Sequence, residues 1–458
     1  MRRDTPGIHM ESIVPVKGSV VDLSKYAGIL SRIQPVRSYG KVSEIVGLVV
    51  EGYGPGASIG EVCRLFPNGG ARPVVAEIVG FRNGRILLMP LETTHGLGPG
   101  CKIRFVGRIA TVPVGPGLLG RVVDGLGNPI DQKGPVSRES EYPVYSDPIN
   151  PLARGRIMEP IDLGIRVVNG LFTCGRGQRL GIFAGSGVGK SVLLGMIARN
   201  TDADVNVIGL IGERGREVRE FLEKNLGEEG LSRSVVVVAP SDTHPLIRMR
   251  AAHVATTVAE YYRDRGKHVL LMIDSLTRFA MAQREIGLSV GEPPATKGYT
   301  PSVFSVLPKL LERSGNLEGA GSITGIYTIL VEGDDFNEPI SDTARSILDG
   351  HIVLSRELAN GNHYPAVDVL ASISRIMPDI VDEEHRRMAG EIIRTVAAYQ
   401  KARDLIHIGA YVKGSSPETD RAIAMIDRVN GFLKQDMNEK VTLQESRNRL
   451  KELLKKGA

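Results

Sequence analysis

The segment AGSGVGKS, at positions 184–191, has the composition of a phosphate-binding loop. The apolar run LGIFA precedes it, and the helical pattern SVLLGMIARN follows it. Glycines in a strand-to-helix turn let successive backbone N–H groups point at phosphate oxygens, and the helix N-terminus adds the positive end of its dipole. We therefore predict a site for nucleotide phosphates. Its residues are Ala184, Gly185, Ser186, Gly187, Val188, Gly189, Lys190, Ser191 and Val192.

Two side chains at the end of this loop extend the prediction to ATP and Mg²⁺. Lys190 is placed to reach the β- and γ-phosphates, and the Ser191 hydroxyl is placed to ligate Mg²⁺. Ala184 stands where such loops usually have their first glycine. An ordinary glycine-rich turn is the alternative, but a Gly-Lys-Ser ending between a strand and a helix disfavours it.

A carboxylate ends a second buried run. In KHVLLMIDS, Asp274 follows six residues of which five are apolar. We expect Asp274 to hold Mg²⁺ through water, as a carboxylate at a strand end does beside a phosphate loop. Many buried strands end in aspartate, so only the combination with the loop makes Asp274 a site prediction.

A third run, VNVIGLIG, is followed by Glu213, Arg214 and the charged segment GREVRE. Open α/β sheets bind ligands outside the carboxyl ends of their strands, so Glu213 would lie over the nucleotide. Glu213 could polarise the attacking water, while Arg214 and Glu217 could hold that carboxylate and the metal-bound waters. The alternative is a helix start covered with salt bridges, and spacing alone leaves both interpretations open.

Continuous apolar runs predict the sheet that must position these residues. Such runs indicate strands covered on both faces, and hence a parallel sheet in an α/β domain. With the phosphate loop they predict a RecA-like core. The GxGxxG dinucleotide fingerprint and the catalytic motifs of kinases are absent from the sequence. The predicted strands are RLGIFA, VNVIGLIG, SVVVVAP, KHVLLMID, SITGIYTILV and HIVLS.

The segments on either side of this core have different patterns. From about Gly40 to Phe105, short β-rich runs predict a small barrel or sandwich, and Asn83-Gly84 is a strong hairpin signal. Beyond Pro378 the chain is predicted to be helical. The helical signals are a face formed by Met388, Ile392, Val396 and Tyr399, and capping-box spacings at Ser415–Glu418 and Thr442–Glu445.

The predicted fold class is a multidomain α/β protein. It combines an N-terminal small β-barrel, a central RecA-like P-loop domain with a parallel sheet, and a C-terminal helical domain. The predicted divisions are an N-terminal segment at 1–30, the barrel at 31–107, the nucleotide-binding domain at 108–378 and the helical domain at 379–458.

Composition excludes several function classes. A net charge of +5 over 458 residues gives no indication of the concentrated basic face of a nucleic-acid binder, and the scarcity of aromatic residues and absence of tryptophan disfavour base-stacking platforms, so no nucleic-acid partner is expected. The three cysteines, Cys63, Cys101 and Cys174, form no CxxC pair, so we expect free thiols in a reducing cytoplasm. No signal peptide or run of about 20 apolar residues is found, so any membrane contact should be peripheral.

The order of these segments resembles the catalytic subunits of rotary ATPases. The β-domain, AGSGVGKS, GERGRE, LLMIDSLTR and PAVDVLASISR follow one another as in that superfamily. Within it, the chain is most similar to the flagellar and type III secretion export ATPases. The segments that carry this similarity are GEPPATKGYTPSVFSVLPKLLERSGN at 291–316, residues 331–356 and residues 411–423. The ATP-synthase subunit differs at PPATKGYTPSVF and carries an acidic rotor-contacting segment.

The resemblance implies roles for the charged residues around the loop. Glu213 matches the water-activating glutamate, and Arg214 and Glu217 match its supporting pair. Asp274 matches the magnesium-associated aspartate. Arg278, in DSLTR, matches an arginine near the catalytic glutamate.

The resemblance also implies roles for residues outside the loop region. Tyr364 matches the aromatic side chain that packs on the adenine, and Tyr411 is aligned with the second wall of that pocket. Arg375 matches the arginine finger, which acts on the ATP of the neighbouring subunit. A segment of about a dozen residues would then link one nucleotide site to the next.

The implied function is ATP hydrolysis in a homohexameric ring that drives flagellar protein export. Such a ring is cytoplasmic and associates peripherally with the inner-membrane export gate, where it releases substrates from export chaperones. A stator-like regulator binds the N-terminal segment, and a coiled-coil stalk protein enters the ring. The alternatives are a virulence type III secretion ATPase and a rotary ATP synthase subunit. A Rho-type RNA motor is a further alternative. It would have RNA-binding strands in which basic residues alternate with aromatic ones, and the barrel segment lacks the expected pattern around its aromatic residues, which are Tyr53, Phe66, Phe81 and Phe105.

Overall fold

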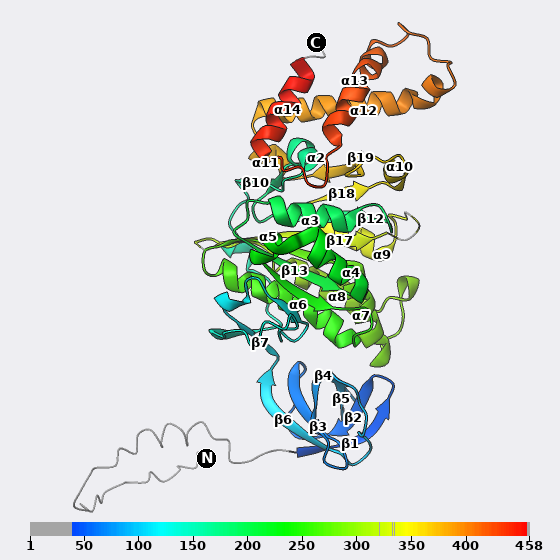
Figure 1. Cartoon of the computed structure of the whole chain (residues 1–458). Coiled ribbons are helices and arrows are strands. Elements are labelled where there is room, and N and C mark those ends of the chain that lie inside the picture. Colours follow the sequence, from blue (N-terminus) through cyan, green and yellow to red (C-terminus); the bar gives the residue numbers. More distant parts are fainter. Residues whose placement is uncertain (1–38, 320, 332, 334, 456–458) are drawn as a thin grey trace, which may run out of the picture.

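The computed structural model describes residues 39–319, 321–331, 333 and 335–455. The predicted segment at 1–30 lies outside these residues. A β-barrel, a domain built on a large sheet and a set of helices follow one another along the chain (Figure 1). This arrangement confirms the predicted fold class.

The N-terminal unit is a closed barrel with strand order β1-β2-β5-β4-β3-β6. Closure leaves no exposed sheet edge, which distinguishes it from the sandwich that the sequence also allowed. Asn83 and Gly84 have φ values of 50° and 74° and connect paired residues Arg82 and Arg85, as the Asn-Gly signal predicted. The strands are β1 (Tyr39–Val46), β2 (Val49–Tyr53), β3 (Glu61–Phe66), β4 (Val74–Arg82), β5 (Arg85–Pro90) and β6 (Lys102–Ile109).

The central domain contains a nine-stranded sheet in the described chain, with order β19-β18-β12-β17-β15-β13-β14-β8 and β16 paired to β17. The pairs from β18 to β8 are parallel, and β19 and β16 join antiparallel. The six predicted strands are all present in the sheet. The strands are β8 (Val122–Asp124), β12 (Arg179–Ala184), β13 (Val205–Ile211), β14 (Ser234–Ala239), β15 (His268–Asp274), β16 (Gly315–Asn316), β17 (Ser322–Leu330), β18 (Gly350–Leu354) and β19 (Val367–Ser374).

Helices cover both faces of this sheet with separate apolar cores. One core joins α6, α7 and α8 to alternate strand residues such as Val207 and Leu271. The other joins α3 and the C-terminal helices to the intervening residues, such as Ile208 and Leu270. The helices of the domain are α2 (Arg166–Leu171), α3 (Lys190–Asn200), α4 (Gly215–Glu220), α5 (Gly227–Ser232), α6 (Pro245–Arg263), α7 (Leu276–Ser289), α8 (Pro301–Leu311) and α9 (Pro339–Ile347).

All three cysteines are buried and free, as predicted. Short elements connect the barrel, the sheet and the helices. The short strands form two pairs, β7 (Thr111–Val114) with β9 (Ser140–Pro143) and β10 (Pro160–Ile161) with β11 (Cys174–Gly175). In the described part of the chain, no helix combines the length and apolar character that a membrane crossing requires.

The C-terminal unit is helical, as predicted. Thr442 N donates to Glu445 Oε2 at 2.8 Å, and Glu445 N donates to Thr442 Oγ1 at 3.2 Å, which confirms that capping box. The predicted cap at Ser415 is wrong by one residue. Pro417 occupies the first helical position, so Ser416 is the extended cap and accepts from Thr419 N. The helices are α10 (Arg356–Asn360), α11 (Met377–Ile380), α12 (Glu383–His407), α13 (Pro417–Leu433) and α14 (Leu443–Lys455).

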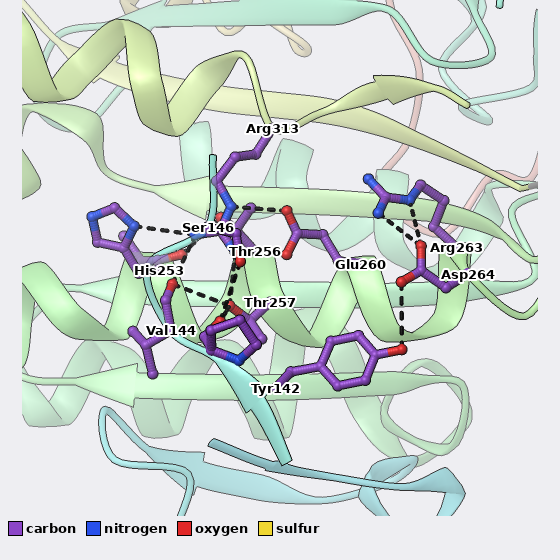
Figure 2. Close-up of polar contacts among 12 residues, drawn as sticks. Tyr142, Val144, Ser146, His253, Thr256, Thr257, Glu260, Arg263, Asp264 and Arg313 are labelled. Carbon is purple, nitrogen blue, oxygen red and sulfur yellow. Dashed lines mark hydrogen bonds and ion pairs between the residues drawn. The ribbon is translucent and has the colours of Figure 1, made fainter. Parts of the chain in front are cut away.

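A buried arginine joins three segments of the central domain (Figure 2). Arg313, just after α8, has 1% of its surface exposed. It donates to both Glu260 carboxylate oxygens at 2.8 and 2.7 Å. It also donates to Thr257 Oγ1 at 2.8 Å and to the Val144 carbonyl at 2.9 Å. This network holds α6 and the segment after β9 against the end of α8.

Replacing Arg313 with leucine should lower the free energy of unfolding by about 3–5 kcal/mol, because the Glu260 carboxylate would remain buried without its cation. The measurement is denaturant unfolding followed by circular dichroism. Arg219→Leu is the matched control, because its ion pair with Glu223 is exposed and its loss should barely change the unfolding midpoint. Equal midpoints for the two variants would contradict a structural role for the buried network.

Candidate functional site

The phosphate loop lies where the sequence predicted it, between β12 and α3. Gly187 and Gly189 have φ values of 78° and 88°, a region that side chains disfavour. A Cβ on Gly189 would also lie 3.3 Å from the Tyr364 ring. Gly189 caps α3 without a side-chain hydrogen bond, so the first-turn N–H groups remain available to an anion.

Strand order brings three predicted residues together. The carboxyl ends of β13, β15 and β17 are adjacent, and β12 with the loop lies beside β17. Lys190 Nζ forms an ion pair with Asp274 Oδ1 and lies 3.5 Å from Glu213 Oε1. Thr328, on β17, donates its hydroxyl to Asp274 Oδ1 at 2.7 Å. The sequence analysis missed Thr328, which carries no motif of its own.

Burial controls the protonation of the carboxyl at the end of β13. Loss of water raises the pKa of Glu213 to about 7; the Lys190 ammonium opposes this rise, and the Asp274 carboxylate adds to it. Burial alone would lower the pKa of Lys190, but Asp274 and Glu213 outweigh it and raise that pKa. A cationic lysine therefore lies beside a carboxyl that gains or loses its proton near neutral pH.

The neighbours of Glu213 are arranged as a chain. The hydrogen bond with Glu213 holds the pKa of Glu217 below its ordinary value. Arg214 Nη1 contacts Glu217 Oε1 at 2.8 Å, with 78% of the Arg214 side chain exposed. Gly212, just before Glu213, lies against Arg278: a Cβ there would be 2.8 Å from the Arg278 Cβ. Arg214 thus reaches the carboxyl through Glu217.

A cavity of about 400 Å³ adjoins the loop. Gly189 and Val192 line one side of it, Tyr364 lines another, and residues 435–437 form a further wall. Tyr364 is 41% exposed, and its carbonyl accepts from Gln435 N at 2.9 Å. The size and apolar character of this cavity suit a nucleotide base, as the prediction for Tyr364 requires.

The structure does not bring Tyr411 to this cavity. Its hydroxyl lies 3.0 Å from Asp420 Oδ1 and 3.2 Å from the Ser416 carbonyl, between α12 and α13.

The wall at 435–437 is held in place by Gln435. The Gln435 Oε1 accepts from Arg166 N at 2.7 Å, and its Nε2 donates to Gly164 O at 2.9 Å. No sequence signal marked this wall, because it is a connection between two helices.

Two further arginines lie near the sheet edge. Arg375 follows β19 and is exposed; its guanidinium lies 3.4 Å from the carbonyls of Leu348 and Arg345 and does not line the cavity. Arg356, at the start of α10, donates to the Ser186 carbonyl of the phosphate loop at 3.1 Å. Sequence reasoning missed Arg356, although it follows a predicted strand end, as Glu213 and Asp274 do.

The donor set fits Mg²⁺ bound together with phosphates. Mg²⁺ in nucleotide sites is usually held by one or two protein groups, by water and by substrate oxygens. Asp274 is at the strand end, and Ser191 is exposed in the first turn of α3. The described residues contain no group of three or more histidine, cysteine or acidic side chains suited to a metal, so the substrate would complete the coordination.

This fold and site define a P-loop nucleotide hydrolase with a RecA-like core between a barrel and a helical domain. Three family models match the chain. The ATP synthase alpha/beta family models match as the beta-barrel domain at 42–107 and the nucleotide-binding domain at 164–374. The T3SS EscN ATPase C-terminal domain matches at 381–452. The chain belongs to the ATP synthase alpha/beta family, in its group of flagellum-specific and type 3 secretion ATPases, and it is an ATPase.

Relatives and solved structures agree with this assignment. The flagellum-specific ATP synthase of Pseudomonas aeruginosa is 54% identical over 93% of this chain and 94% of its own length. The assembled ATPase EscN from the type III secretion system of enteropathogenic E. coli covers 91% of this chain and 100% of its own, with 45% identity and a TM-score of 0.86. EscN in complex with its central stalk EscO matches with 44% identity, the same coverage and a TM-score of 0.83.

Proposed function

We propose that this protein is the ATP-hydrolysing subunit of a homohexameric ring that drives flagellar protein export. The observation that carries the proposal is the 54% identity, over almost the whole chain, with a flagellum-specific relative. The assembled state of EscN supports a ring. An exposed Arg375 that does not line its own nucleotide cavity also supports a ring, because a neighbouring subunit could use it.

The proposed reaction is in-line attack of water on the γ-phosphate of ATP. Glu213, once deprotonated, orients and polarises the water, while Arg214 and Glu217 keep its carboxylate in place. Lys190 and the N–H groups of the loop stabilise charge on the phosphates, and Arg375 of a neighbouring subunit adds a further cation. Mg²⁺, held near Ser191 and Asp274 when bound, supplies additional neutralisation of phosphate charge.

The pKa of Glu213 leads to an expected pH profile. Because burial raises this pKa to about 7, Glu213 is protonated in acid and must lose its proton to polarise water. We expect kcat/KM for ATP to fall about tenfold per pH unit below pH 7 and to level off above it. Steady-state assays between about pH 5.5 and 9, with unfolding checked at each pH, measure the profile. A flat profile across this range would contradict the role of Glu213.

The remaining partners follow from the same proposal. A coiled-coil stalk would enter the ring, as the EscN–EscO complex suggests. A stator-like regulator would bind the segment at 1–30, which lies outside the described residues. The ring would act in the cytoplasm, attached peripherally to the inner-membrane export gate, and would release substrates from export chaperones.

Ring assembly tests the proposal against its alternatives. The purified protein with Mg²⁺ and a non-hydrolysable ATP analogue should elute and weigh as a hexamer in gel filtration with light scattering. A synthase subunit would need a homologous non-catalytic partner, so a monomer under all nucleotide conditions would contradict the ring. Deleting the gene should abolish flagellin export; loss of virulence secretion with normal motility would favour the alternative secretion system.

A further inference from the structure

A second cavity lies behind the wall of the nucleotide cavity. It measures about 430 Å³ and is bounded by β19, α10, α12 and α13. No residue lines both cavities, yet their linings alternate along the chain. His363 and Val367 line the second cavity on either side of residues 364–366, which line the first. Lys434 lines the second, and residues 435–437 line the first. The two cavities therefore share a thin wall.

One polar side chain that lines the second cavity is a buried histidine whose ring Nε2 lacks a hydrogen-bond partner in the described chain. His363 has 7% of its surface exposed, and its backbone N–H donates to the Leu358 carbonyl at 2.9 Å. Its ring Nε2 is buried and has no hydrogen-bond partner among the described residues. A buried polar atom of this kind usually has a partner, supplied by the protein, water or a ligand. Because His363 lines the cavity, its Nε2 is an unpartnered hydrogen-bonding atom at the cavity wall.

Two acidic and two basic side chains line this cavity, and Lys434 is the one of the two cations that is left without an anionic partner in the described chain. Glu357 is paired with Arg403 at 2.6 Å. Asp368 Oδ1 accepts from the backbone N–H groups of Leu370 and Ala371 at 2.9 and 3.0 Å. Lys434 has no ion pair within the described chain. Burial and the nearby Lys434 lower the pKa of His363, so the ring is neutral at pH 7 and can donate from Nε2.

Part of the remaining lining is apolar and suits a hydrocarbon or aromatic body. Val369, Val396 and Ile426 contribute to it together with Leu433. Its volume is within the range of about 300–1,000 Å³ found for small-molecule sites. We propose that this cavity binds a small amphipathic carboxylate whose charged end meets Lys434 and His363. Nothing in the ATP chemistry uses these residues, so the site is additional to the hydrolytic one.

A calorimetric titration with phenylbutyrate tests the site. The full chain is first saturated with Mg²⁺ and a non-hydrolysable ATP analogue, so that the nucleotide cavity is occupied. We expect saturable binding of one phenylbutyrate per chain. Phenylbutanol, which has the same body without the charge, should bind at least about tenfold more weakly, because it loses a charge-assisted contact.

Variants locate the bound probe. Lys434→Gln should weaken phenylbutyrate binding about tenfold, while Lys440→Gln, which removes the same charge outside the cavity, should leave it unchanged. Val396→Trp should abolish binding by filling the cavity. If that variant does not fold, Lys434→Gln and Lys440→Gln decide the result. Three results would each overturn the proposal. The first is that nucleotide completely displaces phenylbutyrate, the second is that phenylbutanol binds as tightly as phenylbutyrate, and the third is that Lys434→Gln binds phenylbutyrate as tightly as the unaltered protein.

Discussion

Arg375→Ala should bind ATP normally and lower kcat by about 10³–10⁵, the range for loss of an arginine finger. The residue is exposed after the edge strand β19, and within the described chain its guanidinium hydrogen-bonds to the backbone carbonyls of Leu348 and Arg345. Its loss should therefore leave folding and the nucleotide cavity intact. Hydrolysis is measured by phosphate release, and binding by titration of a fluorescent ATP analogue. Near-normal turnover in this variant would remove Arg375 from the proposed chemistry.

Mixed rings decide whether Arg375 acts on a neighbouring subunit. Arg375→Ala rings and Lys190→Ala rings should each be inactive. In a mixed ring, a Lys190→Ala subunit still carries Arg375, and an Arg375→Ala subunit still carries an intact phosphate loop. Where the first presents its Arg375 to the loop of the second, one complete site forms. Mixing the two variants should thus restore part of the activity. Arg387→Ala is the matched control and should keep normal activity. Arg387 is also exposed, but it does not line the nucleotide cavity and is not part of the phosphate loop.

Glu213→Gln should trap bound ATP. The amide keeps the size of the side chain but cannot accept a proton from water, so kcat should fall by about 10²–10⁴. Binding should be retained or improved, because the amide removes a carboxyl beside the phosphates. Rapid-quench single-turnover assays measure the chemical step, and the nucleotide content of the purified protein reports trapping.

The control for this substitution is Glu223→Gln. Glu223 lies just beyond α4, is exposed and pairs with Arg219 at 2.7 Å, so its change to glutamine should alter kcat less than about twofold. Normal single-turnover rates in Glu213→Gln would mean that the Glu213 carboxylate has only a structural role. The fall of kcat/KM at low pH could then no longer be assigned to the protonation of Glu213.

Much of the fold was predictable because its determinants are local. The six predicted strands between β12 and β18 are continuous apolar runs, and their bounds in the structure differ from the prediction by at most one residue at either end. The Asn83-Gly84 hairpin follows from backbone conformations that these two residues tolerate. The error at Ser415 is also local: Pro417 fixes the first helical position and moves the cap to Ser416.

The second wall of the base cavity could not be predicted from the sequence. Tyr411 was favoured through resemblance, yet its hydroxyl bonds within the turn between α12 and α13. The wall at 435–437 reads as an ordinary polar connection. It becomes part of the cavity only because Gln435 bonds to Arg166 and Gly164, more than 260 residues earlier in the chain.

By itself the sequence determined the phosphate loop, the strand-end carboxylates Glu213 and Asp274, and the three-part fold, because hydrophobic period, glycine placement and strand ends are local properties. Only the tertiary structure decided that β13, β15 and β17 lie side by side, which places Lys190 against both carboxylates. That order also buries Glu213 enough to raise its pKa to about 7. Strand order and desolvation depend on the packing of distant segments, which no local pattern encodes.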